Sequence, residues 1–324
     1  MLKTKAAIIC LLALLAGGLY LAAQEARLSG PVSGFVFDSV SRSIRPIVGL
    51  PGASYLGDAL VAELDWAAVA PGGDVALAVK DGKLYALRGL GAEAAWAEIE
   101  GGLAAPERAA WSADGSAAVI SSAGDGRLQF LRDLLAGPVA GPLVDLPGAV
   151  SALALEASGD CAVAGVKAGE EGGLYLACPD APARLLAAMS EPAAVVLSRG
   201  GRDLFAVSRS GLILEIQDFG EAAAVMPFAE MPASGWDPVG LAVSADQRLL
   251  FVAHRSEKRV DTFDVESRAL AGQIGVEWEP SLLEPLAVKS VFLLRSASGP
   301  GEPLLVLEAG REPAVYFVPA GRGE

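Results

Sequence analysis

A tight turn recurs five times along this chain, each time between a run of small apolar residues and a fully apolar stretch. The third positions of these turns step by 42, 44, 42 and 46 residues. They are Gly73, Gly115, Gly159, Gly201 and Gln247. A period of this length that holds several short strands is typical of β-propeller blades, not of a helical solenoid. The repeat therefore predicts an all-β single propeller, and 324 residues suffice for it.

Each repeat unit predicts four strands. In the unit that starts at Asp65 they span 66–70, 75–79, 83–87 and 96–99. The second strand is apolar on both faces and must therefore be covered on both sides, which neighbouring blades would do. Third strands such as 260–265 alternate between apolar and polar residues, so we expect them nearer the outer rim.

The unit from Asp237 to Val276 resembles the YVTN-type β-propeller repeat. It reads Pro-Val-Gly-Leu-Ala-Val-Ser-Ala-Asp-Gln over 238–247 and Phe-Val-Ala-His over 251–254. Ala245 replaces the proline of the pattern, Gln247 its glycine and His254 its asparagine. The match is good in this unit and degenerate in the other four. The resemblance implies lactonase-like or WD40-like propeller architecture; such propellers include exported binding proteins and lactonase-like enzymes, so function stays open.

The ends of the repeat region favour six blades, with seven as the alternative. Residues 37–44 echo 263–270, which predicts that the N-terminal part supplies the outer hairpin of a blade. Segments 286–294, 303–308 and 314–318 are expected to supply its inner strands. N- and C-terminal strands that share one blade would close the ring and cover its edges. The propeller is expected to span 34–321, after a linker at 24–33.

Residues 1–23 are expected to form a separate element. Lys3 and Lys5 precede an apolar run over 6–23, which is typical of a secretory signal peptide cut after Ala23. An uncleaved membrane anchor is the alternative, because 18 apolar residues just reach the length that spans a bilayer. The body is therefore expected to be periplasmic or secreted, and in contact with a membrane only through 6–23 if the signal is kept.

Cys161 and Cys178 are the two cysteines that follow this segment. They lie at equal distances from the centre of a glycine-rich turn at 167–173. In a hairpin folded at this turn they would face each other, with Cα atoms about 4.5 Å apart, inside the disulfide range. An oxidising compartment permits the bond. The sequence predicts a disulfide, with two buried thiols one register apart as the alternative.

Charge and motifs exclude several function classes. The formal net charge is −14, and no basic run follows residue 5, so we expect no nucleic-acid partner. No G-x-S-x-G elbow, zinc-ligand spacing, or Walker or Rossmann glycine pattern is present. His254 is the only histidine; we expect it to close a blade by hydrogen bonds, because a catalytic base needs a partner. The sequence leans against an enzyme.

Acidic residues mark the expected start of the first strand in five of six units. They are Asp65, Glu107, Glu191, Asp237 and Glu284, and two aromatic residues, Trp66 and Trp236, stand beside them. Carboxylates gathered at one channel mouth would bind Ca²⁺ or a cationic ligand, whereas solvated rim charges are the alternative. The tryptophans would anchor a partner or simply pack between blades.

These patterns lead to three hypotheses for function. The leading one is an exported, non-catalytic propeller that binds an envelope or extracellular protein or peptide, or another ligand, through its channel-mouth face. The alternative is a metal-assisted, lactonase-like hydrolase that uses the five carboxylates as metal ligands. The third is a purely architectural ring without a ligand site. No motif specifies a ligand or an oligomeric state.

Overall fold

The computed structural model describes residues 30–122, 124–169, 172–231, 235–310 and 312–321. The expected signal peptide or anchor and most of the linker lie outside the described residues. Nearly all regular structure is β-strand, and a short 3-10 turn, η2 (Arg199–Gly201), joins two strands.

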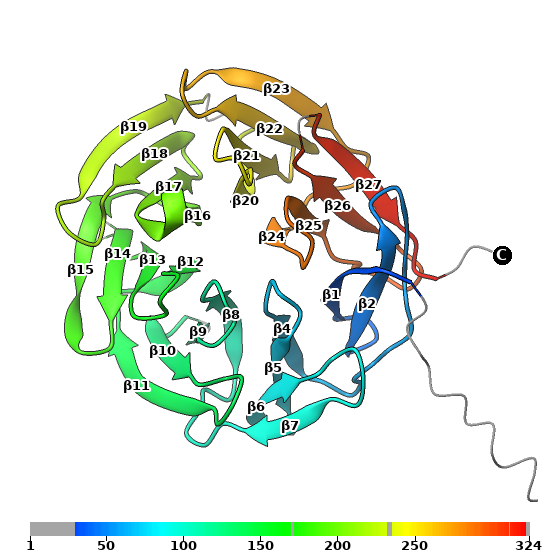
Figure 1. Ribbon diagram of the computed structural model, residues 1–324. Coiled ribbons are helices and arrows are strands. Elements are labelled where there is room, and N and C mark those ends of the chain that lie inside the picture. Colours follow the sequence, from blue (N-terminus) through cyan, green and yellow to red (C-terminus); the bar gives the residue numbers. More distant parts are fainter. Residues whose placement is uncertain (1–29, 123, 170–171, 232–234, 311, 322–324) are drawn as a thin grey trace, which may run out of the picture.

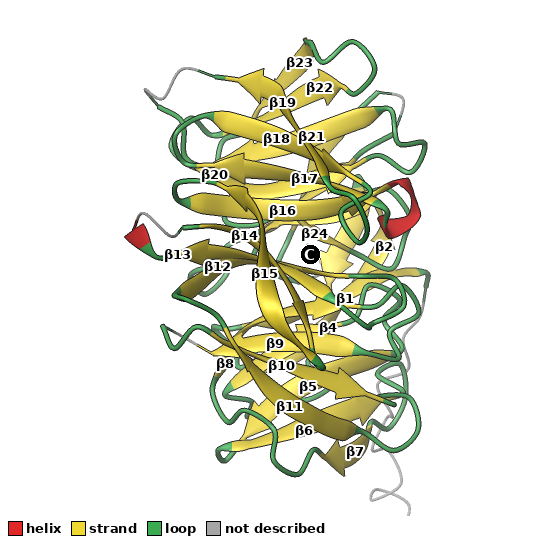
Figure 2. Ribbon diagram, turned by 90° about the vertical axis from the view of Figure 1, so that its left-hand side faces the viewer, coloured by secondary structure: helices red, strands yellow, loops and turns green. Residues whose placement is uncertain are grey.

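The strands form seven sheets, or blades, around a central axis (Figure 1). Seen from the side in Figure 2, most strands run across the thickness of the ring. Blade 1 contains β1 (Val32–Asp38), β2 (Ser43–Leu50) and β3 (Ala53–Leu56). Blade 2 contains β4 (Trp66–Val69), β5 (Val75–Lys80), β6 (Lys83–Arg88) and β7 (Ala95–Glu98). Blade 3 contains β8 (Pro106–Trp111), β9 (Ala118–Ser122), β10 (Arg127–Arg132) and β11 (Val139–Asp145). Blade 4 contains β12 (Ala149–Leu155), β13 (Ala162–Lys167), β14 (Gly173–Cys178) and β15 (Ala181–Ala188). Blade 5 contains β16 (Pro192–Ser198), β17 (Asp203–Ser208), β18 (Leu212–Gln217) and β19 (Ala224–Glu230). Blade 6 contains β20 (Pro238–Val243), β21 (Leu249–His254), β22 (Arg259–Asp264) and β23 (Leu270–Gly275). Blade 7 contains β24 (Glu284–Pro285), β25 (Val291–Arg295), β26 (Leu304–Glu308) and β27 (Ala314–Val318).

The propeller therefore has seven blades, the alternative in the sequence analysis, and not the favoured six. Two strands were missed. They are β3, with four residues, and β24, with two. Six blades are four-stranded and blade 1 is three-stranded. Short strands leave too little alternation of apolar and polar residues to be detected in a sequence.

The prediction that the two chain ends share one blade is wrong. The N-terminal residues form blade 1 and the C-terminal residues form blade 7, and the two sheets pack against each other. Contacts between them include the Leu56 N–H, which donates to the Pro319 carbonyl at 2.9 Å. The ring closes because apolar side chains of two separate sheets bury each other, and hydrogen bonds from Leu56 and Arg45 to the residues after β27 add to this contact.

Blade 1 also runs in the opposite sense to its neighbour. Arg42, which follows β1, forms an ion pair with Asp65, which precedes β4, so β1 ends where β4 begins. The predicted outer hairpin is therefore an inner one, since β1 is the innermost strand of blade 1. The sequence echo reflects a shared turn instead: Asp38 accepts a hydrogen bond from the Ser41 hydroxyl, as Asp264 does from Ser267.

The five predicted turns are all present and connect the first strand of a blade to its second. The third residue of each turn has a positive φ, between 62° and 89°. Glycine favours this conformation at four of the five positions. At the fifth, Gln247 adopts φ 62°, and its side-chain carbonyl accepts a hydrogen bond from the Arg199 N–H at 2.8 Å, which links blades 5 and 6.

The turn at residues 112–116 gives a pH prediction. Hydrogen bonds from the Ser116 N–H and hydroxyl, and from the Ser112 hydroxyl, lower the pKa of Asp114 from 3.8 to about 2. Because the pKa of the folded state is the lower one, this stabilisation is complete above pH 4 and is lost as the pH falls towards 2. A carboxyl NMR titration should find a midpoint near 2 in the native chain and a higher one in Ser116→Ala. A native midpoint near 3.8 would contradict this assignment.

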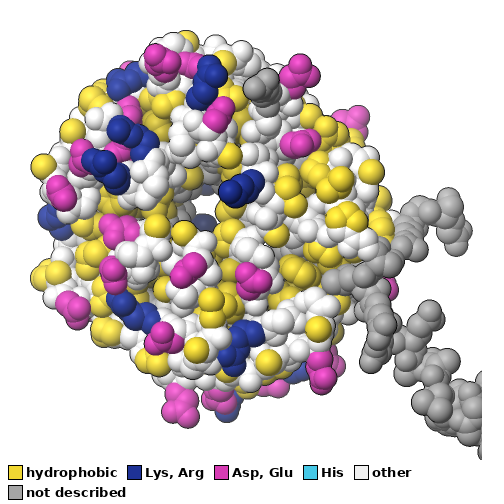
Figure 3. Space-filling model, viewed as in Figure 1, with side chains coloured by type: hydrophobic (Ala, Val, Ile, Leu, Met, Phe, Trp, Pro, Cys, Tyr) yellow, Lys and Arg dark blue, Asp and Glu magenta, His cyan; other side chains and the backbone are white. Residues whose placement is uncertain are grey.

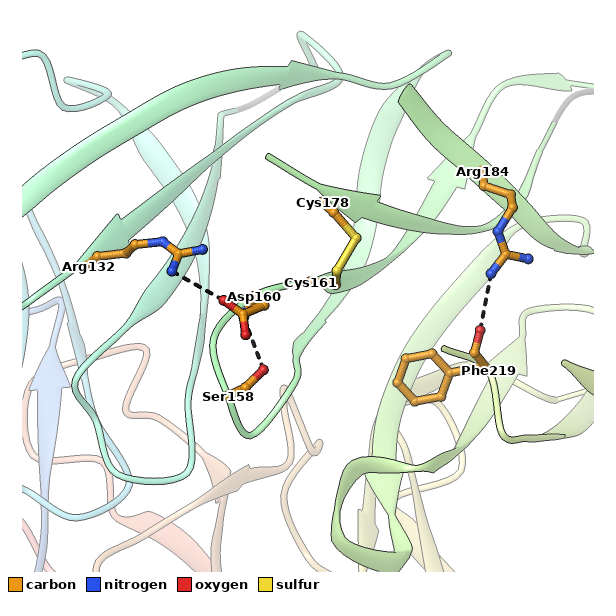
Figure 4. Close-up of a disulfide and its surroundings, with 7 residues drawn as sticks. All are labelled: Arg132, Ser158, Asp160, Cys161, Cys178, Arg184 and Phe219. Carbon is orange, nitrogen blue, oxygen red and sulfur yellow. Dashed lines mark hydrogen bonds and ion pairs between the residues drawn. A yellow bond between two sulfur atoms is a disulfide. The ribbon is translucent and has the colours of Figure 1, made fainter. Parts of the chain in front are cut away.

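The predicted disulfide between Cys161 and Cys178 is confirmed (Figure 4). Cys161 directly precedes β13, and Cys178 ends β14. The two strands are antiparallel, and Ala162 pairs with Ala177, so the cysteines are opposite each other one step further along. Their Cα atoms lie 4.4 Å apart. The bond fixes the open end of this hairpin within blade 4.

The candidate ligand site in the central channel

A cavity of about 550 Å³ lies within the central channel, which is visible as an opening in the middle of the ring in Figure 3. Its walls come mainly from β1, the first strands of the other blades and the residues on either side of β24. Leu293 of β25 and Ser296 after it also contribute. All but four of the lining side chains are apolar; the exceptions are Glu107, Arg108, Glu284 and Ser296. Four are aromatic: Phe35, Phe37, Trp66 and Trp111.

A β-bulge places two charged side chains of blade 3 at this cavity. The register between β8 and β9 shifts between Pro106 and Arg108, so Glu107 is an extra residue on β8. A bulge of this kind changes the direction of the side chains beside it. Both Glu107 and Arg108 are exposed, and both line the cavity.

The same bulge recurs in three other blades without a charge. The register shifts at the corresponding points of β12, β16 and β20, where the extra residues are Ser151, Ala193 and Val239. The residue after the bulge, equivalent to Arg108, is small in these blades: Ala152, Ala194 and Gly240. At Gly240 a Cβ atom would come within 2.6 Å of the Leu283 backbone nitrogen. Among these four bulges, blade 3 alone presents charge.

A third charged residue, Glu284, lines the cavity from β24 of blade 7. Its side chain is exposed to the channel, yet the channel walls surround it with protein. This burial raises the pKa of the Glu284 carboxyl, and attraction to the Arg108 guanidinium offsets only part of the effect. Within the described part of the chain, no ion pair or hydrogen bond joins the side chain of Glu107, Arg108 or Glu284 to another group.

The five predicted acidic residues do not lie at one level of the channel. Glu191 and Asp237 directly precede the first paired residues of their strands, whereas Glu107 follows that point. Glu284 corresponds to Ala242, five residues beyond Asp237, because Leu286 and Ser244 make the same turn hydrogen bond. Five residues of strand span about 16 Å. The regular spacing in the sequence thus suggested a single ring of carboxylates, but the strand register places these residues at different levels of the channel.

Two of these acidic residues are paired with arginines. Asp65 forms an ion pair with Arg42, and Asp237 forms one with Arg209. Neither Asp65, Glu191 nor Asp237 is among the residues that line the cavity. The cavity brings together Glu107 and Glu284 from the predicted set.

The two predicted tryptophans have different surroundings. Trp66 lines the cavity and is half-buried. Trp236 is buried, its Nε1 donates a hydrogen bond to the Ser208 carbonyl at 2.8 Å, and its ring stacks on His254 with centroids 4.3 Å apart. Trp236 therefore packs between blades 5 and 6, the alternative given for it from the sequence.

His254 is fully buried in blade 6, at the end of β21. Its Nε2 lies 3.1 Å from Oδ2 of Asp261, which is also fully buried. Arg259 and Gln273 donate hydrogen bonds to Oδ1 of Asp261, each at 2.9 Å. The only histidine of the chain thus belongs to a buried polar cluster within a blade and does not line the channel.

Metal binding by the acidic residues stays a prediction. Among the residues that the structure describes, no three Asp, Glu, His or Cys side chains are grouped closely enough to hold a metal ion. A calcium site at the channel would therefore have to draw ligands from elsewhere, such as backbone carbonyls or water.

Sequence reasoning identified Trp66 but missed Arg108 and the other three aromatic side chains of the channel. Phe37 was assigned to an outer hairpin, and Phe35 and Trp111 were assigned to no site. Arg108 carries a signal that an alignment of the repeats by strand register would reveal, because it is a charged residue where equivalent positions are small. Arg108 and its three equivalents each stand seven residues before the third position of a predicted turn, so aligning the repeats on their turns would have shown this difference.

Comparisons with known proteins show the fold of this chain and no closer relationship. No protein-family model matches, and neither does any curated protein. Solved structures that it resembles include a putative 6-phosphogluconolactonase from Bacteroides fragilis, with a TM-score of 0.62 and 12% identity over 90% of this chain and 95% of the other. A periplasmic gluconolactonase from Pseudomonas aeruginosa has a TM-score of 0.60 and 15% identity, covering 89% and 96%. The Swd1 β-propeller domain from Myceliophteria thermophila has a TM-score of 0.57 and 12% identity, covering 91% and 98%.

These similarities establish the β-propeller fold. At sequence identities this low, structural similarity shows a shared fold but does not show a shared activity. No helix in the described ranges has the length and apolar character needed to cross a membrane.

Proposed function

We propose that this chain is an exported, non-catalytic binding protein that holds a protein or peptide segment, or another ligand, at its central channel. The observation that carries the proposal is the channel cavity, with its apolar walls, four aromatic side chains and three unpaired charged groups. A cavity of this size, mainly apolar with a few polar groups, is typical of ligand-binding sites.

Export is part of the proposal. It is supported by the disulfide between Cys161 and Cys178, because such bonds persist in oxidising compartments. The resemblance to a periplasmic gluconolactonase supports it too. The N-terminal pattern of Lys3, Lys5 and the apolar run after them is consistent with export to the periplasm or the medium.

Binding would be driven by burial of an apolar group in the channel. A leucine or phenylalanine side chain that leaves water for such a site contributes about 1.5–3 kcal/mol. Trp66 is suited to contact the occupant, since it lines the cavity and is only half-buried. A half-exposed tryptophan at a pocket is a frequent centre of binding energy.

Photo-crosslinking tests the proposal with a matched pair of sites. The photoreactive residue p-benzoylphenylalanine replaces Trp66 in one variant and Trp96 in the other. Trp96 is 41% exposed on β7, the outermost strand of blade 2, away from the channel. After irradiation with envelope extract, we expect one defined adduct from position 66 and none from position 96, as read by mass spectrometry. Equal labelling at both positions, or no adduct at position 66, would overturn the proposal.

A metal-assisted, lactonase-like hydrolase is the second candidate. Two of its five proposed ligands, Glu107 and Glu284, share the cavity, and two of the similar structures are described as lactonases. This candidate requires that Ca²⁺ raise the melting temperature, since a ligand of the folded state stabilises it. It also requires lactone turnover that EDTA abolishes and that Glu284→Gln reduces. Turnover of this kind would displace the non-catalytic proposal.

A further inference from the structure

We infer that the channel cavity binds an apolar zwitterion, an amino acid or short peptide with an apolar side chain, whose carboxylate meets Arg108 and whose ammonium meets Glu284. This inference rests on the proposed function and specifies the ligand of the same site.

The first step is that the charged groups of the cavity lack partners. Two other carboxylates at the start of first strands are paired, Asp65 with Arg42 and Asp237 with Arg209. In the described residues, Arg108 and Glu284 make no ion pair, although they attract each other across the cavity. Both side chains are exposed in the open channel, and a ligand that fills the cavity would displace water from them, which is costly unless the ligand itself supplies partners. A ligand that supplies both partners removes this cost.

The second step is chemical complementarity. A guanidinium group binds a carboxylate through two parallel hydrogen bonds, so Arg108 selects a carboxylate over a neutral group. The Glu284 carboxyl, when ionised, accepts hydrogen bonds from an ammonium group. Opposite charges at two points of one cavity therefore match a molecule with both groups. A ligand with one charge would leave the other protein charge unpaired.

The third step concerns the rest of the ligand. The walls near these charges are apolar, and they include Trp66, Trp111 and Phe37. They favour an aliphatic or aromatic side chain, and the face of a tryptophan also attracts an ammonium group. Glu107 adds a second carboxylate beside Arg108, so the cavity has one cation and two acidic groups. This balance favours a ligand with an ammonium group over a simple fatty acid.

The fourth step is size. About 550 Å³ is within the range of small-molecule sites and holds a free amino acid or a dipeptide. Leucine and leucyl-leucine have the same end groups on bodies of different length. Comparing their affinities shows whether the cavity is suited to a free amino acid or to a short peptide.

The test is calorimetric titration of the mature chain with five defined probes. They are leucine, leucyl-leucine, leucinol, N-acetyl-leucine and the neutral apolar dye N-phenyl-1-naphthylamine. Leucinol lacks the carboxylate, and N-acetyl-leucine lacks the ammonium group. We expect leucine or leucyl-leucine to bind at least tenfold more tightly than either blocked analogue. Arg108→Gln should abolish the preference over leucinol, and Glu284→Gln the preference over N-acetyl-leucine.

Glu63→Gln is the matched control. Glu63 lies on an exposed loop before β4, where it pairs with Lys80, and the variant should keep the preferences of the native chain. Thermal melting establishes that each variant is folded, and Arg108→Lys, which retains the charge, should bind with intermediate affinity. If the dye binds but the zwitterions show no preference, the inference fails and the proposed function stands. If no probe binds, including the dye, both fail.

Discussion

Replacement of Asp261 by alanine should lower the free energy of unfolding by about 3–5 kcal/mol, the usual cost of removing one partner from a buried ionic cluster. The Asp261 carboxylate is fully buried, and it receives hydrogen bonds from Arg259 and Gln273 and contacts His254. Without it, the fully buried His254 imidazole loses its charged neighbour. Chemical denaturation of the native and variant chains measures the difference.

A surface pair with the same spacing is the control. Asp125 and Arg127 form an ion pair two residues apart, as Arg259 and Asp261 do, but both side chains are at least 40% exposed. Asp125→Asn should cost no more than about 1 kcal/mol, because solvent screens exposed pairs. An equal loss in Asp125→Asn and Asp261→Ala would show that burial does not determine the effect.

The same cluster predicts a dependence on pH. Burial raises the pKa of the Asp261 carboxyl, but the contacts with His254 and Arg259 outweigh burial, and the pKa lies below its ordinary value of 3.8. The ionised group therefore stabilises the fold fully above about pH 4, and this contribution is lost as the pH falls through the lowered pKa. The stability difference between the native chain and Asp261→Asn should shrink as the pH is lowered below 4. A difference that does not change with pH would exclude an ionised Asp261.

The repeat turns were predictable because their determinants are local. A residue with positive φ must follow the first strand, and glycine at four of five positions marks the place directly. Cys161 and Cys178 were predictable for the same reason, since hairpin symmetry alone brings them together. The number of blades was not predictable, because β3 and β24 are too short to be recognised. The similarity between residues 37–44 and 263–270 was also misleading, because it reflects a local turn that occurs at two different places in the ring.

The composition of the site depended on which residues of each first strand line the channel, and the pattern of acidic residues did not resolve this. Glu107 lies eight residues before the turn residue Gly115, whereas Glu191 lies ten residues before Gly201. Glu107 is therefore equivalent to Ala193, and it follows the first paired residue of its strand and lines the cavity, whereas Glu191 precedes that point. Phe35 could not be assigned to the channel either, because the resemblance of 37–44 to an outer hairpin did not show that β1 is an inner strand.

Loss of the Cys161–Cys178 bond should be the second large effect on stability, about 3 kcal/mol. The two residues are separated by 17 positions, and closing a loop of this length restricts the unfolded chain by about that amount. The double variant Cys161→Ala/Cys178→Ala should therefore melt several degrees lower than the native chain. Dithiothreitol should lower the melting temperature of the native chain and leave that of the double variant unchanged.

The position of the bond within blade 4 determines what else should change. The bond joins β13 and β14, which already pair through a complete ladder, so its loss should leave the native strand pairing intact. Hydrogen exchange should then accelerate most in this hairpin, where Ala162 and Ala177 form the pair next to the bond, and little in the distant blade 7. Uniform acceleration across all seven blades would mean that the bond stabilises the ring only by restricting the unfolded chain. Local acceleration would mean that it also holds the end of the hairpin against opening in the folded state.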